Sequence, residues 1–196
     1  MMTHGTIEDM SLPTLADLVS LPAVDHPELV AEATARALPS WPDADSVAVI
    51  EIDPDLADTA ALTEAYDLPA EGSGNCVLVA GSRNGEERVA ACVVAADTRA
   101  DVNSLVKRLL DVRKASFLPM DRAVEESGME YGGITPVGLP AGWRVLIDAR
   151  LLTVERVVIG SGLRRSKLLL PGSALASLPG AEIVEGLGKP IPPAAG

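Results

Sequence analysis

The sequence predicts an α+β fold, in which a mixed, curved, barrel-like β-sheet of about seven strands is flanked by helices. Short apolar segments typical of strands recur along the chain without the regular alternation with helices that marks a βαβ series. Apolar residues make up 47% of the 196 residues, which is enough for a sizeable core. We therefore expect one domain over residues 11–188, between an N-terminal tail (1–10) and a Pro-rich C-terminal tail (189–196).

The N-terminal part of the chain predicts three helices and one strand. The sequence Asp25-His26-Pro27-Glu28 is a typical helix start, because a capping aspartate precedes an early proline and an acid in the first turn. We expect this helix to end before Pro39. The other elements are a short helix over 12–19, a strand over 46–52 and a helix over 56–66.

Residues 76–80 and 88–95 predict a β-hairpin around the turn Ser82-Arg83-Asn84-Gly85. Both segments are almost continuously apolar, which indicates strands buried on both faces. They contain Cys76 and Cys92, the only two cysteines. Because intracellular thiols usually stay reduced, we expect two free thiols in the core.

The second half of the chain predicts helices and strands in irregular order. A helix over 101–110 is capped by Thr98 or Asp101, and a helix over 121–127 is stopped by Gly128. Further expected elements are strands over 143–147, 156–159 and 166–170, a short helix over 171–178, and a last short strand after Gly180.

Composition excludes several classes of protein. Aromatic residues make up only 3% of the chain, which argues against proteins that read single-stranded RNA by stacking bases on aromatic side chains. No apolar run approaches the ~20 residues needed to span a bilayer. No secretory signal is recognisable, so we expect a cytoplasmic protein without a membrane or DNA partner. Two cysteines and two distant histidines are too few ligands for a metal site.

The net charge of −12 is unevenly distributed. Residues 1–70 contain fourteen acids and one arginine, a net charge of −13, whereas residues 71–196 contain fourteen acids and fifteen bases, a net charge of +1. Overall acidity argues against strong non-specific nucleic-acid binding. The C-terminal two-thirds is where a polyanion would dock, and the acidic N-terminal third is compatible with a protein-interaction domain.

The most informative segment is Tyr131-Gly132-Gly133-Ile134-Thr135-Pro136-Val137-Gly138. Three glycines and a proline within seven residues exclude a helix interior, because glycine permits φ > 0 and proline removes a hydrogen-bond donor. Such a stiff loop is suited to presenting backbone N–H groups to a ligand. The alternative is a tight structural connection.

The order of motifs around this loop resembles the YbaK/prolyl-tRNA-synthetase-associated domain family. Arg113-Lys114 is followed by the glycine loop, a strand ending at Asp148, Gly160-Ser161-Gly162, and an apolar strand that leads to Pro171-Gly172. The resemblance covers about residues 25–187 and is clearest from Arg113 onward. It implies a mixed, curved β-sheet with flanking helices and a pocket where the glycine loop meets the central strands.

The resemblance also implies a function, the hydrolysis of wrongly attached amino acids from the tRNA 3′ end, without a metal or organic cofactor. Association with an aminoacyl-tRNA synthetase would be compatible with this function. The catalytic positions that it implies are Asn75, Gly132, Gly133 and Asp148. The implied substrate-binding positions are Thr135, Pro136, Gly160, Ser161 and Gly162.

Elementary chemistry suggests roles for some of these residues. The backbone N–H groups of Gly132 and Gly133 could stabilise the tetrahedral oxyanion of ester hydrolysis. Asp148 could hold the substrate α-ammonium or orient a water, or it could simply cap a turn. Ser161 is not a convincing nucleophile, because neither histidine is placed in a motif with it. Arg113, Lys114, Arg164 and Arg165 are candidate tRNA contacts; the second pair belongs to a basic run that continues to Lys167.

The chain departs from the family at one position. The family has a functional lysine on the strand occupied here by Gly74-Asn75-Cys76-Val77, and Asn75 carries no charge. Two hypotheses remain: a deacylase that acts on mischarged tRNA in trans, and a catalytically inactive relative that binds an aminoacyl group or a small metabolite.

Overall fold

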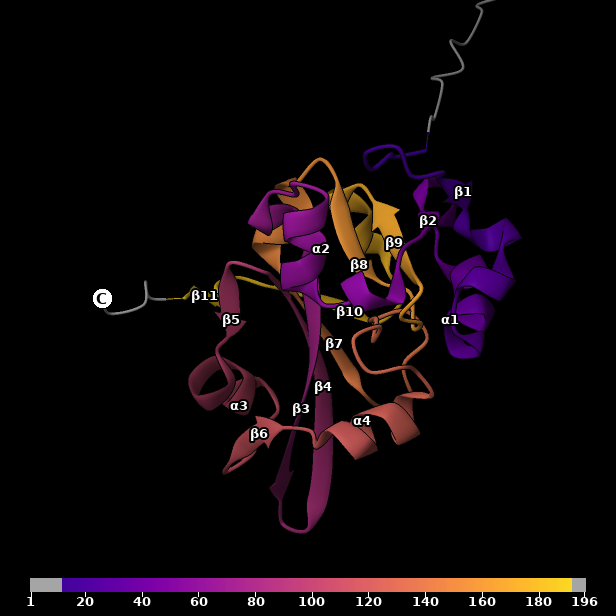
Figure 1. Ribbon diagram of the computed structural model, residues 1–196. Coiled ribbons are helices and arrows are strands. Elements are labelled where there is room, and N and C mark those ends of the chain that lie inside the picture. The colour runs from indigo at the N-terminus through magenta and orange to yellow at the C-terminus, as the bar shows by residue number, and fades with distance from the viewer. Residues whose placement is uncertain (1–11, 192–196) are drawn as a thin grey trace, which may run out of the picture.

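The computed structural model describes residues 12–191, so the predicted N-terminal tail lies outside the described residues (Figure 1). Within them, eleven strands form three sheets rather than one barrel-like sheet of seven. The largest sheet has the order β10-β7-β4-β3-β6. Its strands are β3 (Gly74–Arg83), β4 (Glu86–Ala95), β6 (Ala115–Phe117), β7 (Arg144–Asp148) and β10 (Ala181–Val184).

A second sheet has the order β1-β2-β9-β8, and β11 pairs with β5 in a third. Their strands are β1 (Leu21–Pro22), β2 (Ala48–Glu51), β8 (Val157–Gly160), β9 (Ser166–Leu170), β5 (Thr98–Ala100) and β11 (Gly188–Pro190). Strand β7 is parallel to β4 and to β10, whereas the other pairs of strands are antiparallel. The predicted α+β class with a mixed sheet is therefore confirmed.

The helices are short. The α-helices are α1 (Glu32–Ala37), α2 (Thr59–Ala65), α3 (Lys107–Leu109) and α4 (Met120–Ser127), and a π-helix over Val102–Val106 precedes α3. The 3₁₀ helices span Ala23–Asp25, Pro27–Leu29, Leu38–Ser40, Ala44–Ser46, Pro54–Leu56, Ala70–Gly72, Ala149–Thr153 and Gly172–Ser177.

Strands β3 and β4 form a long hairpin within the largest sheet. Asn84 and Gly85 both have positive φ, as a two-residue hairpin turn requires, which confirms the predicted hairpin. Figure 1 shows α2 near one end of the hairpin and its turn at the other, with α3 and α4 on either side. Residues 90–95 of β4 are buried on both faces. On one face, Ala90, Cys92 and Val94 belong to a core cluster that includes Val106 and Leu110. On the other face, Ala91 belongs to a cluster that includes Leu118 and Ala123, and Val93 and Ala95 belong to a third cluster.

Cys76 and Cys92 are free thiols, as expected. In the hairpin, Cys76 pairs with Val93 and Val77 pairs with Cys92. Because side chains alternate along a strand, the two cysteines lie on opposite faces of the sheet.

Several predicted helices differ from the observed structure. Residues 12–19 form a turn with a Leu15–Leu18 bridge and no helix, because Ala16 adopts a φ of +47° that interrupts a right-handed helix. The helix predicted over 25–37 breaks at Val30, which is extended, and the Ala31 N–H donates to Ser161 O (3.1 Å) instead of to its own helix. The helix predicted over 171–178 is a 3₁₀ helix.

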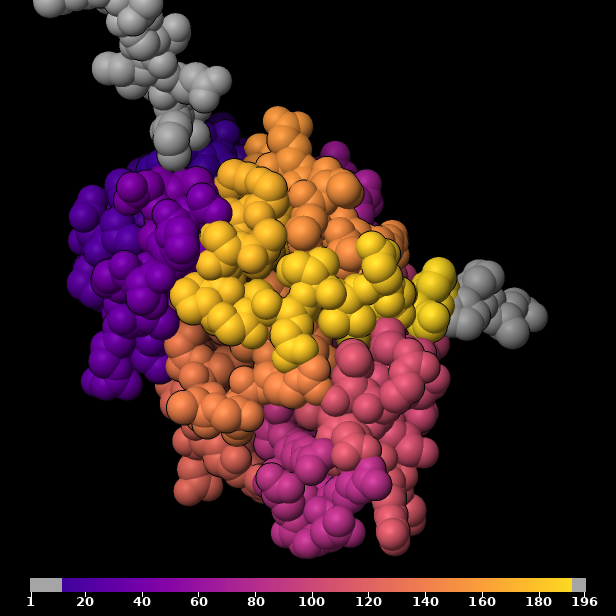
Figure 2. Space-filling view, turned by 180° about the vertical axis from the view of Figure 1, so that it is seen from behind, coloured from indigo at the N-terminus to yellow at the C-terminus, as the bar shows by residue number. Residues whose placement is uncertain are grey.

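Other local predictions are confirmed. Gly128 ends α4 with a φ of 68°. Asp101 caps the π-helix over Val102–Val106, because its side chain accepts a hydrogen bond from Ser104 N (3.2 Å). Lys189 and Pro190, which the sequence analysis places in a tail, belong instead to β11. Figure 2 shows the C-terminal segment lying across the back of the molecule, where β10 pairs with β7 and β11 with β5.

Candidate active site

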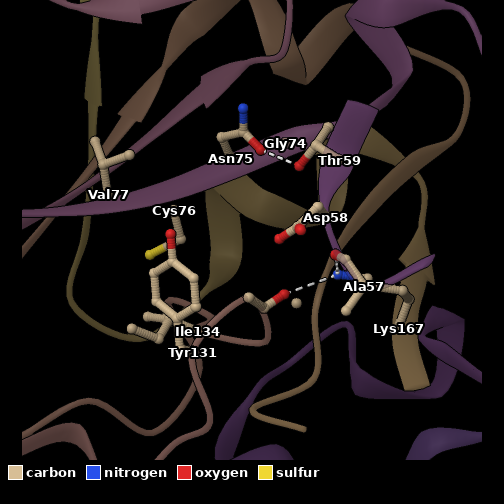
Figure 3. Close-up of a pocket in the computed structure, with 12 residues that line it drawn as sticks. Ala57, Asp58, Thr59, Gly74, Asn75, Cys76, Val77, Tyr131, Ile134 and Lys167 are labelled. Carbon is tan, nitrogen blue, oxygen red and sulfur yellow. Dashed lines mark hydrogen bonds between the residues drawn. The ribbon is translucent and has the colours of Figure 1, made fainter. Parts of the chain in front are cut away.

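A pocket of about 210 Å³ lies where the start of α2, the start of β3, the glycine loop and the β8–β9 pair meet (Figure 3). Its wall includes acidic, basic, amide, hydroxyl, thiol and apolar groups. The lining residues are Ala57, Asp58, Thr59, Gly74, Asn75, Cys76, Val77, Tyr131, Gly132, Ile134, Gly160 and Lys167.

Of the residues that the structure describes, Lys167 is the only basic one that lines this pocket. It belongs to β9, where it lies between Ile50 of β2 and Gly160 of β8, and only 5% of the residue is exposed. Its Nζ donates to Ala57 O (2.6 Å) and to Gly132 O (3.1 Å). Lys167 therefore connects the segment before α2 to the glycine loop.

Burial lowers the pKa of Lys167 to about 8. Asp58 opposes this shift by favouring the charged ammonium, whereas Arg164 adds to it. At neutral pH the side chain is still mostly protonated, so the pocket holds a poorly solvated positive charge.

Asp58 supplies the negative charge of the pocket. It occupies the N-cap position of α2, but its side chain makes no capping hydrogen bond. Figure 3 shows its carboxylate directed into the pocket, toward the side where Cys76 and Tyr131 lie. Within residues 12–191, Asp58 and Lys167 do not approach closely enough to form an ion pair, so a ligand can contact either.

Asn75 lines the pocket, and its amide oxygen accepts a hydrogen bond from Thr59 Oγ1. Gly132 and Gly160 line the same pocket, as the sequence analysis expected. Gly133, Thr135, Asp148 and Ser161 are absent from its lining. The pocket is therefore lined by some of the predicted site residues, namely Asn75, Gly132 and Gly160. It is also lined by residues that were not predicted, above all Asp58 and Lys167.

The two glycine-rich loops are joined directly through their backbones. Glu130 N donates to Gly162 O (2.9 Å), and Gly162 N donates to Gly133 O (2.7 Å). A Cβ atom at Gly160 would collide with the carbonyl oxygens of Gly133 and Ile134. Glycine is required here because the loops approach too closely for a side chain.

The expectation that both Gly132 and Gly133 present free N–H groups to a ligand is wrong for Gly133. Its N–H donates to Glu130 O (2.9 Å) and closes a turn. Gly132 has a φ of +81°, and a Cβ atom there would lie 2.7 Å from Arg164 Nη1 and 3.4 Å from Asp58 Oδ1. The absence of a side chain at Gly132 therefore leaves space in the pocket beside Asp58 and Arg164.

Asp148 is fully buried away from the pocket. Its Oδ1 accepts from Arg150 N (3.1 Å) and its Oδ2 from Gly188 N (2.7 Å). These bonds cap the turn after β7 and anchor β11, which is the capping alternative that the sequence left open.

The remaining predicted substrate-binding residues serve the framework. Ser161 Oγ shares a hydrogen bond with Ser166 Oγ (2.8 Å). Thr135 is buried, and Pro136 lines a separate cavity. Gly162 packs against Ala31.

The four predicted tRNA contacts do not form one cluster. Arg164 lies beside the pocket and donates to Tyr131 O (3.1 Å) and Pro54 O (3.0 Å), and the neighbouring Arg165 is exposed. Arg113 and Lys114 are exposed at the other end of β3, near Gly81, which is six residues from Asn75. Six strand residues span about 20 Å, so the two pairs are well separated.

The pocket offers no activated protein nucleophile. Burial, together with the nearby Cys92, raises the pKa of the Cys76 thiol well above its usual range, so it stays protonated at neutral pH. No group of three or more His, Cys, Asp and Glu side chains suited to a metal ion occurs within residues 12–191. In the same range, no helix has the length and apolar character to cross a bilayer.

In the sequence, Lys167 ends a basic run that begins at Arg164. A signal for its burial was present: it is followed directly by three leucines in a strand that the sequence marks as apolar. Asp58 carried no comparable signal, since an acid near a helix start is common.

Comparison with known proteins adds a second line of observation. Residues 53–178 match the model of the aminoacyl-tRNA editing domain. A solved structure described as a candidate trans-editing enzyme for prolyl-tRNA synthetase is 18% identical, with a TM-score of 0.67 over 81% of this chain and 96% of that one. The hypothetical protein APE2540 is 22% identical, with a TM-score of 0.64 over 72% of this chain and 90% of that one. At these identities, the two structures show a shared fold.

Proposed function

The chain belongs to the aminoacyl-tRNA editing domain family, and we propose that it hydrolyses, in trans, the ester that joins a wrongly attached amino acid to the tRNA 3′ end. The observation that carries this proposal is the small pocket in which Asp58 and Lys167 offer opposite charges without pairing with each other. An aminoacyl ester presents an α-ammonium group and a polarised carbonyl a few atoms apart. The two charges of the pocket complement these two groups.

Asp58 binds the substrate α-ammonium in this proposal. Its carboxylate is exposed toward the pocket and is not used in capping α2. The amino-acid side chain then faces the wall formed by Cys76, Val77 and Ile134. A volume of about 210 Å³ restricts this space to a small part of the substrate, with the rest of the tRNA outside.

Water is the attacking group. Cys76 is held as a thiol, and Ser161 is engaged with Ser166 outside the pocket. Direct hydrolysis needs only a positioned carbonyl, a water and stabilisation of the oxyanion.

The tRNA approaches the side of the pocket that carries Arg164 and Arg165. Arg165 is exposed, and guanidinium groups match phosphate geometry. The similarity to a candidate trans-editing enzyme for prolyl-tRNA synthetase extends the proposal to association with an aminoacyl-tRNA synthetase.

A second candidate function is binding of an aminoacyl group without hydrolysis. One observation favours it: on β3 the pocket presents the neutral Asn75, whose amide oxygen is already occupied by Thr59. This candidate shares the fold and the pocket with the first, and it differs only in turnover.

The deciding experiment is a deacylation screen of the purified chain over correctly charged and mischarged tRNAs. We expect at least one mischarged tRNA to lose its amino acid faster than in buffer and faster than its correctly charged counterpart. Release at the buffer rate for all of them, combined with binding of a non-hydrolysable 3′-aminoacylamido-adenosine, would support the second candidate instead.

A further inference from the structure

Lys167 is held in the pocket in a way that leaves part of its ammonium group unused. A lysine ammonium has three N–H donors, and two are occupied by Ala57 O and Gly132 O. No third acceptor is bonded to Nζ in the part of the chain that the structure describes. One N–H is therefore available to a ligand in the pocket that Lys167 lines.

Resting on the proposed function, we propose that Lys167 is the catalytic cation of this pocket, and that its free N–H stabilises the negative charge that develops on the ester carbonyl oxygen. The charge thus comes from β9, on the opposite side of the pocket from Asn75 of β3. Nothing in the sequence pattern assigns this role to Lys167, because the lysine expected from the family resemblance falls at position 75.

The chemical step involves no proton loss from Lys167. Water attacks the ester carbonyl carbon, and the carbonyl oxygen becomes an oxyanion. This oxyanion accepts a hydrogen bond from the third N–H of Lys167. The bond from carbon to the ribose oxygen then breaks. The ribose oxygen takes up one of the water protons, giving the tRNA hydroxyl, and the released acid loses its remaining proton to solvent as a carboxylate.

The surroundings suit this role. Lys167 is 5% exposed, so its charge acts in a poorly solvated space where electrostatic interactions are stronger than in water. The two carbonyl oxygens fix the position of Nζ, so little reorganisation is needed when charge develops. Asp58 and Arg164 are the other charged groups facing it, and Asp58 favours the protonated form.

A purely structural lysine is the competing explanation, because the same two hydrogen bonds connect the segment before α2 to the glycine loop. The two explanations differ in what they require of the third N–H. A structural lysine, whose ammonium does not contact the reacting carbonyl, contributes about equally to binding a ground-state analogue with a neutral carbonyl and an anionic tetrahedral analogue. A catalytic cation contributes mainly to the anionic one.

The experiment therefore uses two 3′-substituted adenosines as probes, both with the α-ammonium group: an aminoacylamide, whose carbonyl is neutral, and a phosphonate that mimics the tetrahedral oxyanion. Wild type should bind the phosphonate more tightly than the amide. Lys167→Met should lose that preference by at least about tenfold and lower the deacylation rate about 10²-fold or more, while amide affinity changes only a few-fold. Lys167→Arg, which keeps the charge, should retain part of the preference.

Arg144→Met is the matched control for stability. Arg144 also bonds a backbone carbonyl, that of Leu109, and pairs with Glu182 away from the pocket. Its loss should lower the melting temperature without changing the preference for the phosphonate.

The outcomes separate the two proposals. A folded Lys167→Met variant that hydrolyses or discriminates as well as wild type overturns the role of Lys167 and leaves the proposed function standing. A wild type that hydrolyses no aminoacyl-tRNA overturns the proposed function. If wild type also shows no preference for the phosphonate, the role of Lys167 fails independently, and this measurement needs no variant to fold.

Discussion

Lys167 Nζ donates a 3.1 Å hydrogen bond to the carbonyl oxygen of Gly132, which joins a buried strand to the loop that the sequence marks most clearly. This bond places the loop and the cation of the pocket in one unit. Changes in the loop should therefore alter the position of Lys167, and changes in the protonation of Lys167 should alter the stability of the fold.

The first prediction concerns pH and stability. The pKa of Lys167 is lowered to about 8 in the folded state from 10.5, so between these values the unfolded chain binds more protons. The cost of burying this charge is fully present below pH 8 and disappears as pH rises toward 10.5. Urea unfolding at pH 7.5, 9 and 10 should show wild type gaining stability relative to Lys167→Met. An unchanged difference between the two proteins across this range would contradict the shifted pKa.

The same protonation should govern catalysis. If the ammonium stabilises the oxyanion, the enzyme-catalysed rate, corrected for spontaneous ester hydrolysis, should fall as pH rises through about 8. A lysine acting as a neutral base would give a rise over the same range. Single-turnover deacylation from pH 6.5 to 9 distinguishes the two signs.

Gly132→Ala should impair the site. The residue has a φ of +81°, which costs an alanine about 1–2 kcal/mol, and the new methyl group would lie 2.7 Å from Arg164 Nη1. Gly142→Ala is a matched control, because Gly142 has a φ of +92° with nothing within 4 Å of an added Cβ. Both variants should lose similar stability, but only Gly132→Ala should lose most of its deacylation rate. Equal activity in the two variants would argue against the pocket.

Asp148→Ala should act mainly on stability. The variant leaves the buried N–H of Gly188 and the N–H of Arg150 without their acceptor, which costs about 1–3 kcal/mol for each buried group. Thermal melts should show the loss, while the protein that remains folded should keep its affinity for the aminoacylamide probe. A stable variant with lost binding would return Asp148 to the active site, as the family resemblance implies.

Asn75→Lys tests whether a lysine on β3 can supply the positive charge that Lys167 supplies from β9. In wild type, a second ammonium near Lys167 would lower the pKa of both through like-charge repulsion, so we expect no gain in rate. In the Lys167→Met background, the same substitution should restore part of the lost rate by supplying a cation from β3. Deacylation by the double variant at the level of Lys167→Met alone would show that position 75 cannot replace the β9 charge.

Charge reversal should separate the two basic pairs. Arg164→Glu with Arg165→Glu should weaken tRNA binding and reduce its salt dependence, because phosphate contacts release counterions. Arg113→Glu with Lys114→Glu, about 20 Å farther along β3, should have the smaller effect. Filter binding at several salt concentrations gives both slopes, and a larger effect from the second pair would place the docking face at the hairpin end.

Local chemistry determined which parts of the fold could be predicted from sequence. Asn84-Gly85 and Gly128 specify a hairpin turn and a helix end through their own backbone preferences, and both were located correctly. The short strands β1, β5, β6 and β11 were missed, because two or three residues contain no readable pattern and depend on distant partners. The break at Val30 depends on a bond from Ala31 to Ser161, more than a hundred residues away.

The site was predicted in part for the same reason. Glycines that allow close approach of two loops are visible in the sequence, so Gly132 and Gly160 were identified as pocket residues. An aspartate at the end of a strand has the same sequence pattern whether it caps a turn or binds a substrate. The role of Asp148 could therefore not be assigned from sequence. Lys167 was grouped with its basic neighbours, although it lies within β9, whose five residues are all buried, whereas Arg165 precedes the strand and is exposed.

The bond from Gly188 N to Asp148 Oδ2 also bears on how the chain is made. Strand β7 acquires its second parallel neighbour, β10, only after residue 184 has been synthesised, and the carboxylate of Asp148 receives its second donor four residues later. A ribosome that stops before Gly188 would release a chain in which the buried carboxylate of Asp148 lacks one of its two donors. The described fold is thus complete only after residues 188–190 have been synthesised, and tags are best attached beyond Pro190.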